Sequence, residues 1–373
     1  MDSDVPTTGI LNSNFYILYS NLDLLGFAAG AIGVNGYCTP ELVQARHKFM
    51  RGGDFISGWG KILRGKLPLL SIEITSECPL SCPGCYAYGD RHLGGGVTLT
   101  QLSDSRGENL VQGILRLVDQ HDPMQLSLVG GEPMMRHREL SKLLPILSAR
   151  GIYTMVVTSG VIPIPAEWTS LPRVTIAISV DGLREHHDER RKPATYERIL
   201  RNIAGRRVYI HWTAVRAHVQ NLSYAERYLE FWSEQEEVHR IWMSVYTPQR
   251  GEQSAERLTQ EDRKRLANAI PELARKFPKF LIKGGMAKAI LSPPRSPAEC
   301  AFARVSANYT ADLRTRVAPC VFGGDPDCSE CGCAISSALH WITNEKAGPI
   351  AARHLLDGSL RIGSAVARLK WAS

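Results

Sequence analysis

The stretch LLSIEITSECPLSCPGC, residues 69–85, joins a strongly apolar run to three closely spaced cysteines. The run 69–75 is rich in Leu and Ile, which is typical of a strand in a parallel sheet covered by helices. Cys78, Cys82 and Cys85 follow it directly. We therefore expect the three thiols at the carboxyl end of a first strand, where barrels built of β/α repeats carry their chemistry.

Five further runs rich in Val, Ile and Leu follow, at residues 124–129, 153–158, 174–180, 208–215 and 241–246. Segments with apolar residues at helical spacing lie between them, at 110–118, 140–147 and 224–232. Six β/α repeats predict an α/β fold, a partial (β/α)6 TIM-like barrel with a small C-terminal cysteine-rich domain.

Three regions are expected along the 373 residues: an N-terminal extension at 1–68, the barrel at 69–246 and a C-terminal region at 247–373. The C-terminal region should begin with a helix capped by Thr259, because Leu266, Ile270 and Leu273 then share one face. The prolines of 292–294 mark a boundary after it.

The composition narrows the class of protein. The net charge of +7, from 44 Lys and Arg against 37 Asp and Glu, suits an anionic ligand or membrane surface and does not require nucleic acid. The N-terminus lacks the basic start of a signal peptide, and the uncharged run 24–40 is too short and glycine-rich to span a bilayer. We therefore expect a cytoplasmic protein, in which nine cysteines point to metal or cluster ligation.

The cysteine triplet at 78, 82 and 85 suits an iron–sulfur cluster, since thiolates are the usual ligands of such clusters. Three thiolates from one loop can hold three irons of a [4Fe–4S] cluster and leave the fourth iron open to a ligand. Half of a zinc site is the alternative, because CxxC pairs are common zinc-binding turns.

Residues 69–246 resemble the radical S-adenosylmethionine (SAM) superfamily, with a weaker likeness that reaches about residue 335. The likeness rests on the triplet and on motifs at later strand ends. These are Gly130-Gly131-Glu132-Pro133, Thr158-Ser159-Gly160, Ser179-Val180-Asp181-Gly182, His187-Asp188 and Arg191.

This resemblance implies a SAM-binding [4Fe–4S] cluster held by Cys78, Cys82 and Cys85, which makes a 5′-deoxyadenosyl radical. It further implies that Glu132 accepts from the SAM amino group, and that Ser179 and Arg191 contact the carboxylate or ribose. The other implied cofactor-binding residues are Gly130, Gly131, Pro133, Ser159 and Asp181. Gly84 replaces the aromatic residue that many members place before the third cysteine, so Tyr86 or Tyr88 is expected to pack against adenine.

Five cysteines lie in the C-terminal region: Cys300, Cys320, Cys328, Cys331 and Cys333. They resemble the auxiliary-cluster domains called SPASM and Twitch, which implies one auxiliary [4Fe–4S] cluster bound by three or four of them. A structural zinc knuckle is the alternative. Cys38 stands alone and is expected to be a buried thiol.

The substrate is less well defined by the sequence. Basic amphipathic segments around Phe49 and Trp59 are able to lie on an anionic membrane surface, and Gly84 also resembles radical SAM enzymes that act on hopanoid lipids. A small-molecule or lipid substrate, with peripheral contact to the inner membrane surface, is therefore the first expectation. A peptide is the alternative substrate, and a zinc-binding adaptor protein is the non-enzyme alternative. The resemblance also implies a flavodoxin- or ferredoxin-type electron donor.

Overall fold

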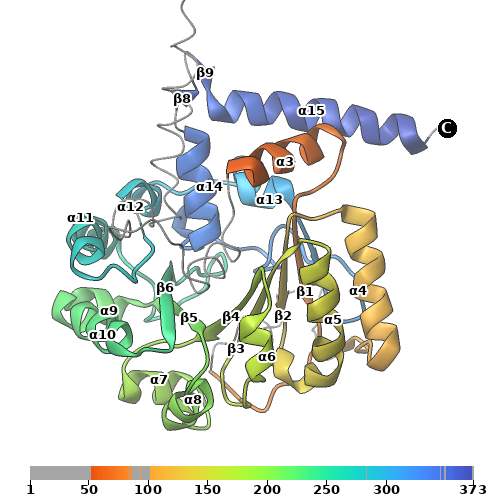
Figure 1. The fold of residues 1–373 in the computed structure, drawn as a ribbon. Helices are drawn as coiled ribbons and strands as arrows, with labels where there is room; N and C mark the ends of the chain where they lie inside the picture. Colours follow the sequence, from red (N-terminus) through yellow and green to blue (C-terminus); the bar gives the residue numbers. More distant parts are fainter. Residues whose placement is uncertain are drawn as a thin grey trace, which may run out of the picture.

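The computed structural model describes residues 52–83, 85, 93, 101–282, 284–344, 346–347 and 350–371. Its centre is a seven-stranded sheet in the order β6-β5-β4-β3-β2-β1-β7, in which all neighbouring strands are parallel (Figure 1). The strands are β1 (Leu69–Glu73), β2 (Gln125–Val129), β3 (Tyr153–Thr158), β4 (Val174–Ser179), β5 (Val208–Ala214), β6 (Val238–Val245) and β7 (Ser306–Tyr309). The predicted α/β class is confirmed, and the sheet stays open between β6 and β7.

The seventh strand is the main difference from the predicted barrel of six repeats. β7 pairs with β1, with Ala307 opposite Leu70 and Tyr309 opposite Ile72. It comes from the region that the sequence assigned to a separate cysteine-rich domain, so the sheet does not end at residue 246. The sequence hid this strand because only two of its four residues are apolar.

Helices cover the outer face of the sheet (Figure 1). They are α4 (Gly107–His121), η3 (Pro133–Arg136), α5 (His137–Ala149), α6 (Ala166–Ser170), α7 (Arg184–Arg190), α8 (Tyr196–Ile203), α9 (Arg216–Gln220) and α10 (Leu222–Glu234). The three predicted helical segments fall within α4, α5 and α10. Trp168, Trp212 and Trp232 are almost fully buried in the core between sheet and helices, which gives this layer a large apolar contribution to stability.

The C-terminal region wraps around the open side of the sheet. It contains α11 (Gln260–Lys276), α12 (Gly284–Leu291), α13 (Ala301–Val305), η4 (Cys328–Glu330), α14 (Ala334–Asn344), β8 (Lys346–Ala347), β9 (Ile350–Ala351) and α15 (Ala352–Trp371). The predicted cap of α11 is present, because Thr259 Oγ1 accepts from the Asp262 amide at 3.1 Å and Asp262 Oδ2 accepts from the Thr259 amide at 3.0 Å. Helix α14 packs against β6 and against α13, which leads into β7.

The helix α3 (Gly52–Leu63) covers the amino ends of the strands together with α15 (Figure 1). Its Trp59 indole donates to Ser359 Oγ at 2.9 Å, and Ile62 is buried with Leu356. In the described part of the predicted amphipathic segment, Trp59 and Ile62 therefore pack inside the protein, whereas Ile56 and Leu63 are exposed. The part around Phe49 and the lone Cys38 lie outside the described residues. Within the described ranges, no helix is both long and apolar enough to cross a membrane.

Candidate active site

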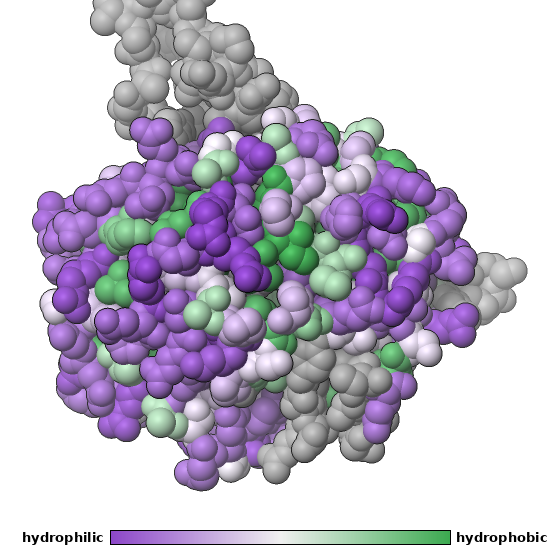
Figure 2. Space-filling model, turned by 90° about the horizontal axis from the view of Figure 1, so that it is seen from below, coloured by the Kyte–Doolittle hydropathy of each residue, from purple (hydrophilic) through white to green (hydrophobic). Residues whose placement is uncertain are grey.

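A cavity of about 340 Å³ opens at the carboxyl ends of the strands. Seen from that side, apolar residues gather near the centre of the surface and hydrophilic residues surround them (Figure 2). Every strand of the sheet contributes to the lining, through Ser71, Ser127, Met155, Ser179, His211, Ser244 and Asn308. The volume lies within the range of small-molecule sites in proteins.

Cys78, Cys82 and Cys85 all line this cavity, as the sequence predicts for a set of ligands. The loop that carries them is tied to the barrel, since the Ser81 amide donates to the Lys192 carbonyl at 2.8 Å. Burial raises the pKa of the Cys78 thiol to about 11. A bound metal centre offsets this effect, because it stabilises the thiolate.

An ion network holds the start of the cysteine loop. No motif in the sequence predicted it. Asp104 accepts from the Thr75 hydroxyl at 2.6 Å and from the Ser76 amide at 3.0 Å. Arg136 donates to Asp104 and to Glu77, both at 2.9 Å. The network fixes the direction in which the chain leaves β1.

The predicted glycine motif brings the end of β2 against the end of β1. The Gly131 amide donates to the Thr75 carbonyl at 2.8 Å. Gly130 has a φ of +126°, and a Cβ there would lie 2.5 Å from the same carbonyl oxygen. Only glycine fits such a backbone. Gly130 and Gly131 line the cavity, whereas Pro133 is buried at the start of η3.

Glu132 lies behind the cavity wall and is fully buried. Its Oε1 accepts from the Met134 amide at 3.0 Å and from the Thr158 hydroxyl at 2.6 Å. Its Oε2 accepts from the Ser159 amide at 2.8 Å and also from the Ser159 hydroxyl. Four protein donors therefore occupy this carboxylate, which joins β2 to β3. Its predicted direct contact with SAM stays a prediction.

Replacement of Glu132 by glutamine should lower the free energy of unfolding by about 1–3 kcal/mol. The amide NH₂ would face the Ser159 or Thr158 and Met134 donors, which would leave buried groups unpaired. Glu167→Gln, at an exposed position of α6, is the control. Urea denaturation of both variants measures the difference, and equal stability of the two would contradict the bridging role.

The fourth predicted motif brings Ser179 and Arg191 to the cavity lining. Asp181 lies fully buried behind them, and its Oδ2 accepts from Arg191 Nε at 2.8 Å and from Arg190 Nη1 at 2.5 Å. Burial raises the pKa of Asp181, but Arg191 and Arg190 outweigh burial and hold that pKa well below its usual value. Asp181 therefore acts as a positioning residue that orients the arginines.

The His187-Asp188 pair stabilises the segment that carries Arg191. His187 is fully buried, its Nε2 lies 2.8 Å from the Thr195 hydroxyl, and burial lowers its pKa to about 4. Asp188 Oδ1 accepts from the Thr195 and Tyr196 amides, at 2.7 and 2.9 Å, where α8 begins. Both residues serve the local fold and keep Arg191 in place. Tyr86 lies outside the described residues.

The five C-terminal cysteines meet in a second, smaller pocket, as the sequence predicts for one auxiliary site: Cys300, Cys320, Cys328, Cys331 and Cys333. Their loop is held by Glu330, which receives two bonds of 2.6 Å from Arg257. Gly332 lies so close to β6 that a Cβ would be 2.1 Å from the Val245 carbonyl oxygen.

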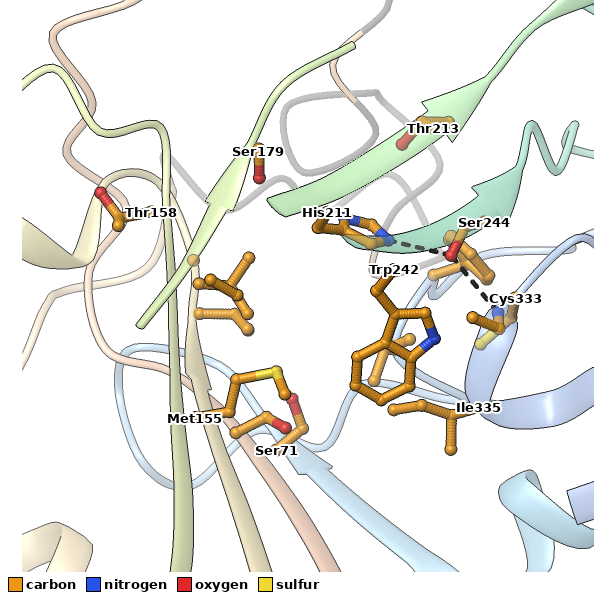
Figure 3. A pocket seen from close by; sticks show the side chains of 18 of the residues that line it. Ser71, Met155, Thr158, Ser179, His211, Thr213, Trp242, Ser244, Cys333 and Ile335 are labelled. Atoms are coloured by element: carbon orange, nitrogen blue, oxygen red, sulfur yellow. Dashed lines mark hydrogen bonds between the residues drawn. The ribbon is translucent and has the colours of Figure 1, made fainter. Parts of the chain in front are cut away.

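Cys333 connects the two sites, because it lines the small pocket and the large cavity. Figure 3 shows it at the edge of the large cavity beside Ser244 and Ile335. Burial raises the pKa of Cys333 well above its usual value, and it raises that of Cys320 to about 12. Buried sulfur donors of this kind fit a metal centre, which stabilises the thiolate form.

Residues 72–210 match the family model described as the radical SAM superfamily. This chain contains a radical SAM domain. The resemblance predicted from the motifs is thereby confirmed, the chain is an enzyme, and the cofactors expected for its domain are SAM and a [4Fe–4S] cluster.

Two curated relatives match part of this chain. The PqqA peptide cyclase of Rhizobium meliloti (strain 1021) is 31% identical over 121 residues, which cover 32% of this chain and 30% of that protein. The PqqA peptide cyclase of Xanthomonas campestris pv. campestris (strain B100) is 31% identical over 96 residues, which cover 25% and 23%. The chain thus spans less than a third of the length of these relatives.

Two solved structures share the fold at low identity. Streptococcus suis SuiB bound to precursor peptide SuiA has a TM-score of 0.51 and 15% identity, over 93% of this chain and 76% of that chain. Native anSMEcpe with bound AdoMet has a TM-score of 0.50 and 16% identity, over 68% and 74%. Both support the open α/β barrel seen around the radical SAM site.

The donor set fits the iron–sulfur cofactors of a radical SAM domain. Three thiols lie on one loop and five more in one pocket, and no carboxylate lines the described parts of either site. Within the described part of the chain, no three His, Cys, Asp or Glu side chains surround the position of a single metal ion. A four-iron cluster does not require such convergence, because each thiolate binds a different iron.

The cavity residues that sequence reasoning missed include His211, Trp242, Ser244 and Asn308. His211 Nε2 lies 2.9 Å from Ser244 Oγ, and both side chains point into the cavity beside Trp242 (Figure 3). Burial lowers the pKa of His211. The available signal was a polar residue at an alternate position of an expected strand, as for His211 and Ser244, because alternate residues of a strand point to the same face.

Proposed function

We propose that this chain is a radical SAM enzyme that modifies a peptide at an unactivated carbon. The observation that carries the proposal is the shared cavity, which is lined by the cysteine triplet, by Gly131 and Arg191, and by Cys333 at its other side. The large cavity therefore joins the expected SAM-binding side to the five-cysteine pocket, with space between them for a substrate.

The residues of the chain have separable roles in this proposal. Cys78, Cys82 and Cys85 would hold a [4Fe–4S] cluster, which supplies the electron for reductive cleavage of SAM to a 5′-deoxyadenosyl radical. Gly130 and Gly131 keep the end of β2 close to Thr75, and their backbone groups would be available to the amino acid part of SAM. Arg191 presents its guanidinium to an anionic group, and such a fork suits the SAM carboxylate.

The five-cysteine pocket would hold an auxiliary cluster next to the substrate. Of its five cysteines, Cys333 alone also lines the large cavity. Arg263 fixes this region, since it is fully buried and donates to the Glu330 and Cys331 carbonyls of the cysteine loop, and to the Ile290 carbonyl on α12 at 3.0 Å. These bonds hold the loop rigid, which is the requirement for positioning a redox centre.

The peptide class is supported by the PqqA peptide cyclases, which share 31% identity in the matched part of the chain. The sequence favoured a small-molecule or lipid substrate, on the basis of Gly84 and the basic amphipathic extension. Gly84 lies outside the described residues, and the described part of the extension packs on α15. A peptide is therefore the better-supported substrate.

Deuterium transfer provides the test. The reconstituted enzyme, with SAM and a chemical reductant, is incubated under anaerobic conditions with extracts of source cells that lack the gene and were grown in deuterated medium. Peptide, small-metabolite and lipid fractions are supplied separately. We expect deuterium in 5′-deoxyadenosine only with the peptide fraction, and its loss after protease digestion, as read by mass spectrometry. Transfer from the lipid or metabolite fraction would refute the peptide class.

A further inference from the structure

A row of polar side chains crosses the floor of the cavity. Asn308 on β7 is paired with Ser71 on β1, and Ser71 is paired with Ser127 on β2. All three line the cavity. Because Ser71 lies two residues before the end of β1, this row is deeper in the barrel than the cysteine triplet and Arg191, which follow strand ends. Figure 3 shows Ser71 beside Met155 at the far side from Ser179.

Asn308 has an unused acceptor in this row. Its side chain is only 4% exposed, and its Nδ2 donates to Ser306 Oγ at 3.5 Å. Its Oδ1 is buried and has no hydrogen-bond partner among the described residues. An acceptor buried in this way destabilises the protein as long as it stays unpaired. A ligand that donates a hydrogen bond to Oδ1 removes this destabilisation.

The charges around the cavity limit the kind of donor. No Asp or Glu is among the described residues that line it, and the only full charges there are those of Arg190 and Arg191. An ammonium group at the floor beside Asn308 would find no carboxylate to pair with, so burial of such a cation there is costly. A carboxylate would leave Asn308 Oδ1 facing another acceptor. An uncharged O–H or N–H group needs no counter-charge and donates a hydrogen bond to Asn308 Oδ1.

Apolar side chains form the walls above this row. Trp242, Met155 and Ile335 border the same space (Figure 3). A ligand group that reaches Asn308 must pass them, so it gains from an apolar body that displaces water there. Burial keeps the pKa of His211 low, so the imidazole adds no charge to this wall at neutral pH.

We propose that Asn308 is a specificity-determining residue that accepts a hydrogen bond from the end of an uncharged substrate side chain. The body of that side chain is apolar and lies against Trp242 and Met155, and its end carries an O–H or N–H donor. This inference rests on the proposed function, because it takes the floor of the cavity as the place of the substrate. It adds the chemical class of the side chain that enters.

Equilibrium dialysis of the reconstituted, SAM-loaded enzyme tests the inference with two matched pairs of probes. The pairs are N-acetyl-tyrosine amide with N-acetyl-phenylalanine amide, and N-acetyl-glutamine amide with N-acetyl-methionine amide. In the wild type, the donor-bearing probe of at least one pair should bind about tenfold more tightly than its partner. In Asn308→Leu, that ratio should fall to about one. Asn268→Leu, the same change at an exposed position of α11, should keep the wild-type ratio.

A second variant covers the case in which Asn308→Leu does not fold. Asn308→Asp keeps the shape of the side chain and adds a negative charge, so it should shift the preference toward N-acetyl-lysine amide. Ratios near one for both pairs in the wild type, an unchanged ratio in Asn308→Leu, or no shift in Asn308→Asp would each overturn the proposal. Release of 5′-deoxyadenosine without any probe is measured in parallel. Its absence in the wild type refutes the proposed function, whereas its presence with ratios near one refutes only the role of Asn308.

Discussion

Replacement of Cys82 by alanine is expected to reduce formation of 5′-deoxyadenosine below detection. Cys82 is one of three thiols that line the cavity from a single loop. A SAM-binding cluster with two protein ligands in place of three loses the coordination that fixes its open iron, so neither electron transfer nor SAM binding is supported. The same change should lower the iron content of the reconstituted protein, which gives a readout that does not depend on turnover.

Cys328→Ala is the matched comparison, since it removes a thiol from the five-cysteine pocket instead. It should also lower the iron content, but it should leave reductive cleavage of SAM in place and abolish the modified product. High-performance chromatography of 5′-deoxyadenosine separates the two cases. If Cys82→Ala still releases it, the assignment of the triplet is wrong. Equal loss in both variants would mean that the two cysteine groups do not have separate roles.

The sheet was predictable from the sequence wherever a strand is long and apolar. Each of the runs behind β1 to β6 carries at least two buried apolar residues, so each stands out in the sequence as a strand. The strand β7 was not predicted because its inward positions, Ser306 and Asn308, are polar, and only Ala307 and Tyr309 face the core side. Its place beside β1 depends on pairing across more than 200 residues of chain, which no local pattern encodes.

The candidate site was predictable where a motif follows a strand directly. The cysteine triplet and Ser179 reach the same cavity because parallel strands end at one edge of the sheet. What those side chains contact was less accessible from sequence. The Glu132 and Asp181 carboxylates accept hydrogen bonds from residues outside their own motifs, such as Ser159 and Arg190. Because both carboxylates are buried, neither lies at the cavity surface.

Asp181 also explains why residues beyond 246 belong to the site. Arg190, which binds Asp181, makes two further bonds to Glu256, at 2.6 and 3.0 Å. The next residue, Arg257, holds the cysteine loop through Glu330. Two adjacent residues therefore link the expected SAM-binding side to the five-cysteine pocket.

Replacement of Asp181 by asparagine is expected to cost about 3–5 kcal/mol of folding free energy at neutral pH. The variant leaves Arg190 and Arg191 without the carboxylate that neutralises them in a buried place, and it frees Arg191 at the cavity surface. Binding of SAM should weaken as well, because the guanidinium is no longer oriented. Asp119→Asn, which breaks the exposed pair with Arg150, should change stability by no more than about 1 kcal/mol.

The pH dependence of this effect has a defined sign. The pKa of Asp181 in the folded protein lies well below its usual value, so the unfolded chain binds the proton more readily. The stabilisation is therefore fully present above the unfolded pKa of about 3.9, and it declines as the pH falls below that value. Urea denaturation from pH 7 down to pH 3 should show the gap between wild type and Asp181→Asn narrowing only at the acid end. A gap that is constant over the whole range would indicate that the carboxylate acts through shape rather than charge.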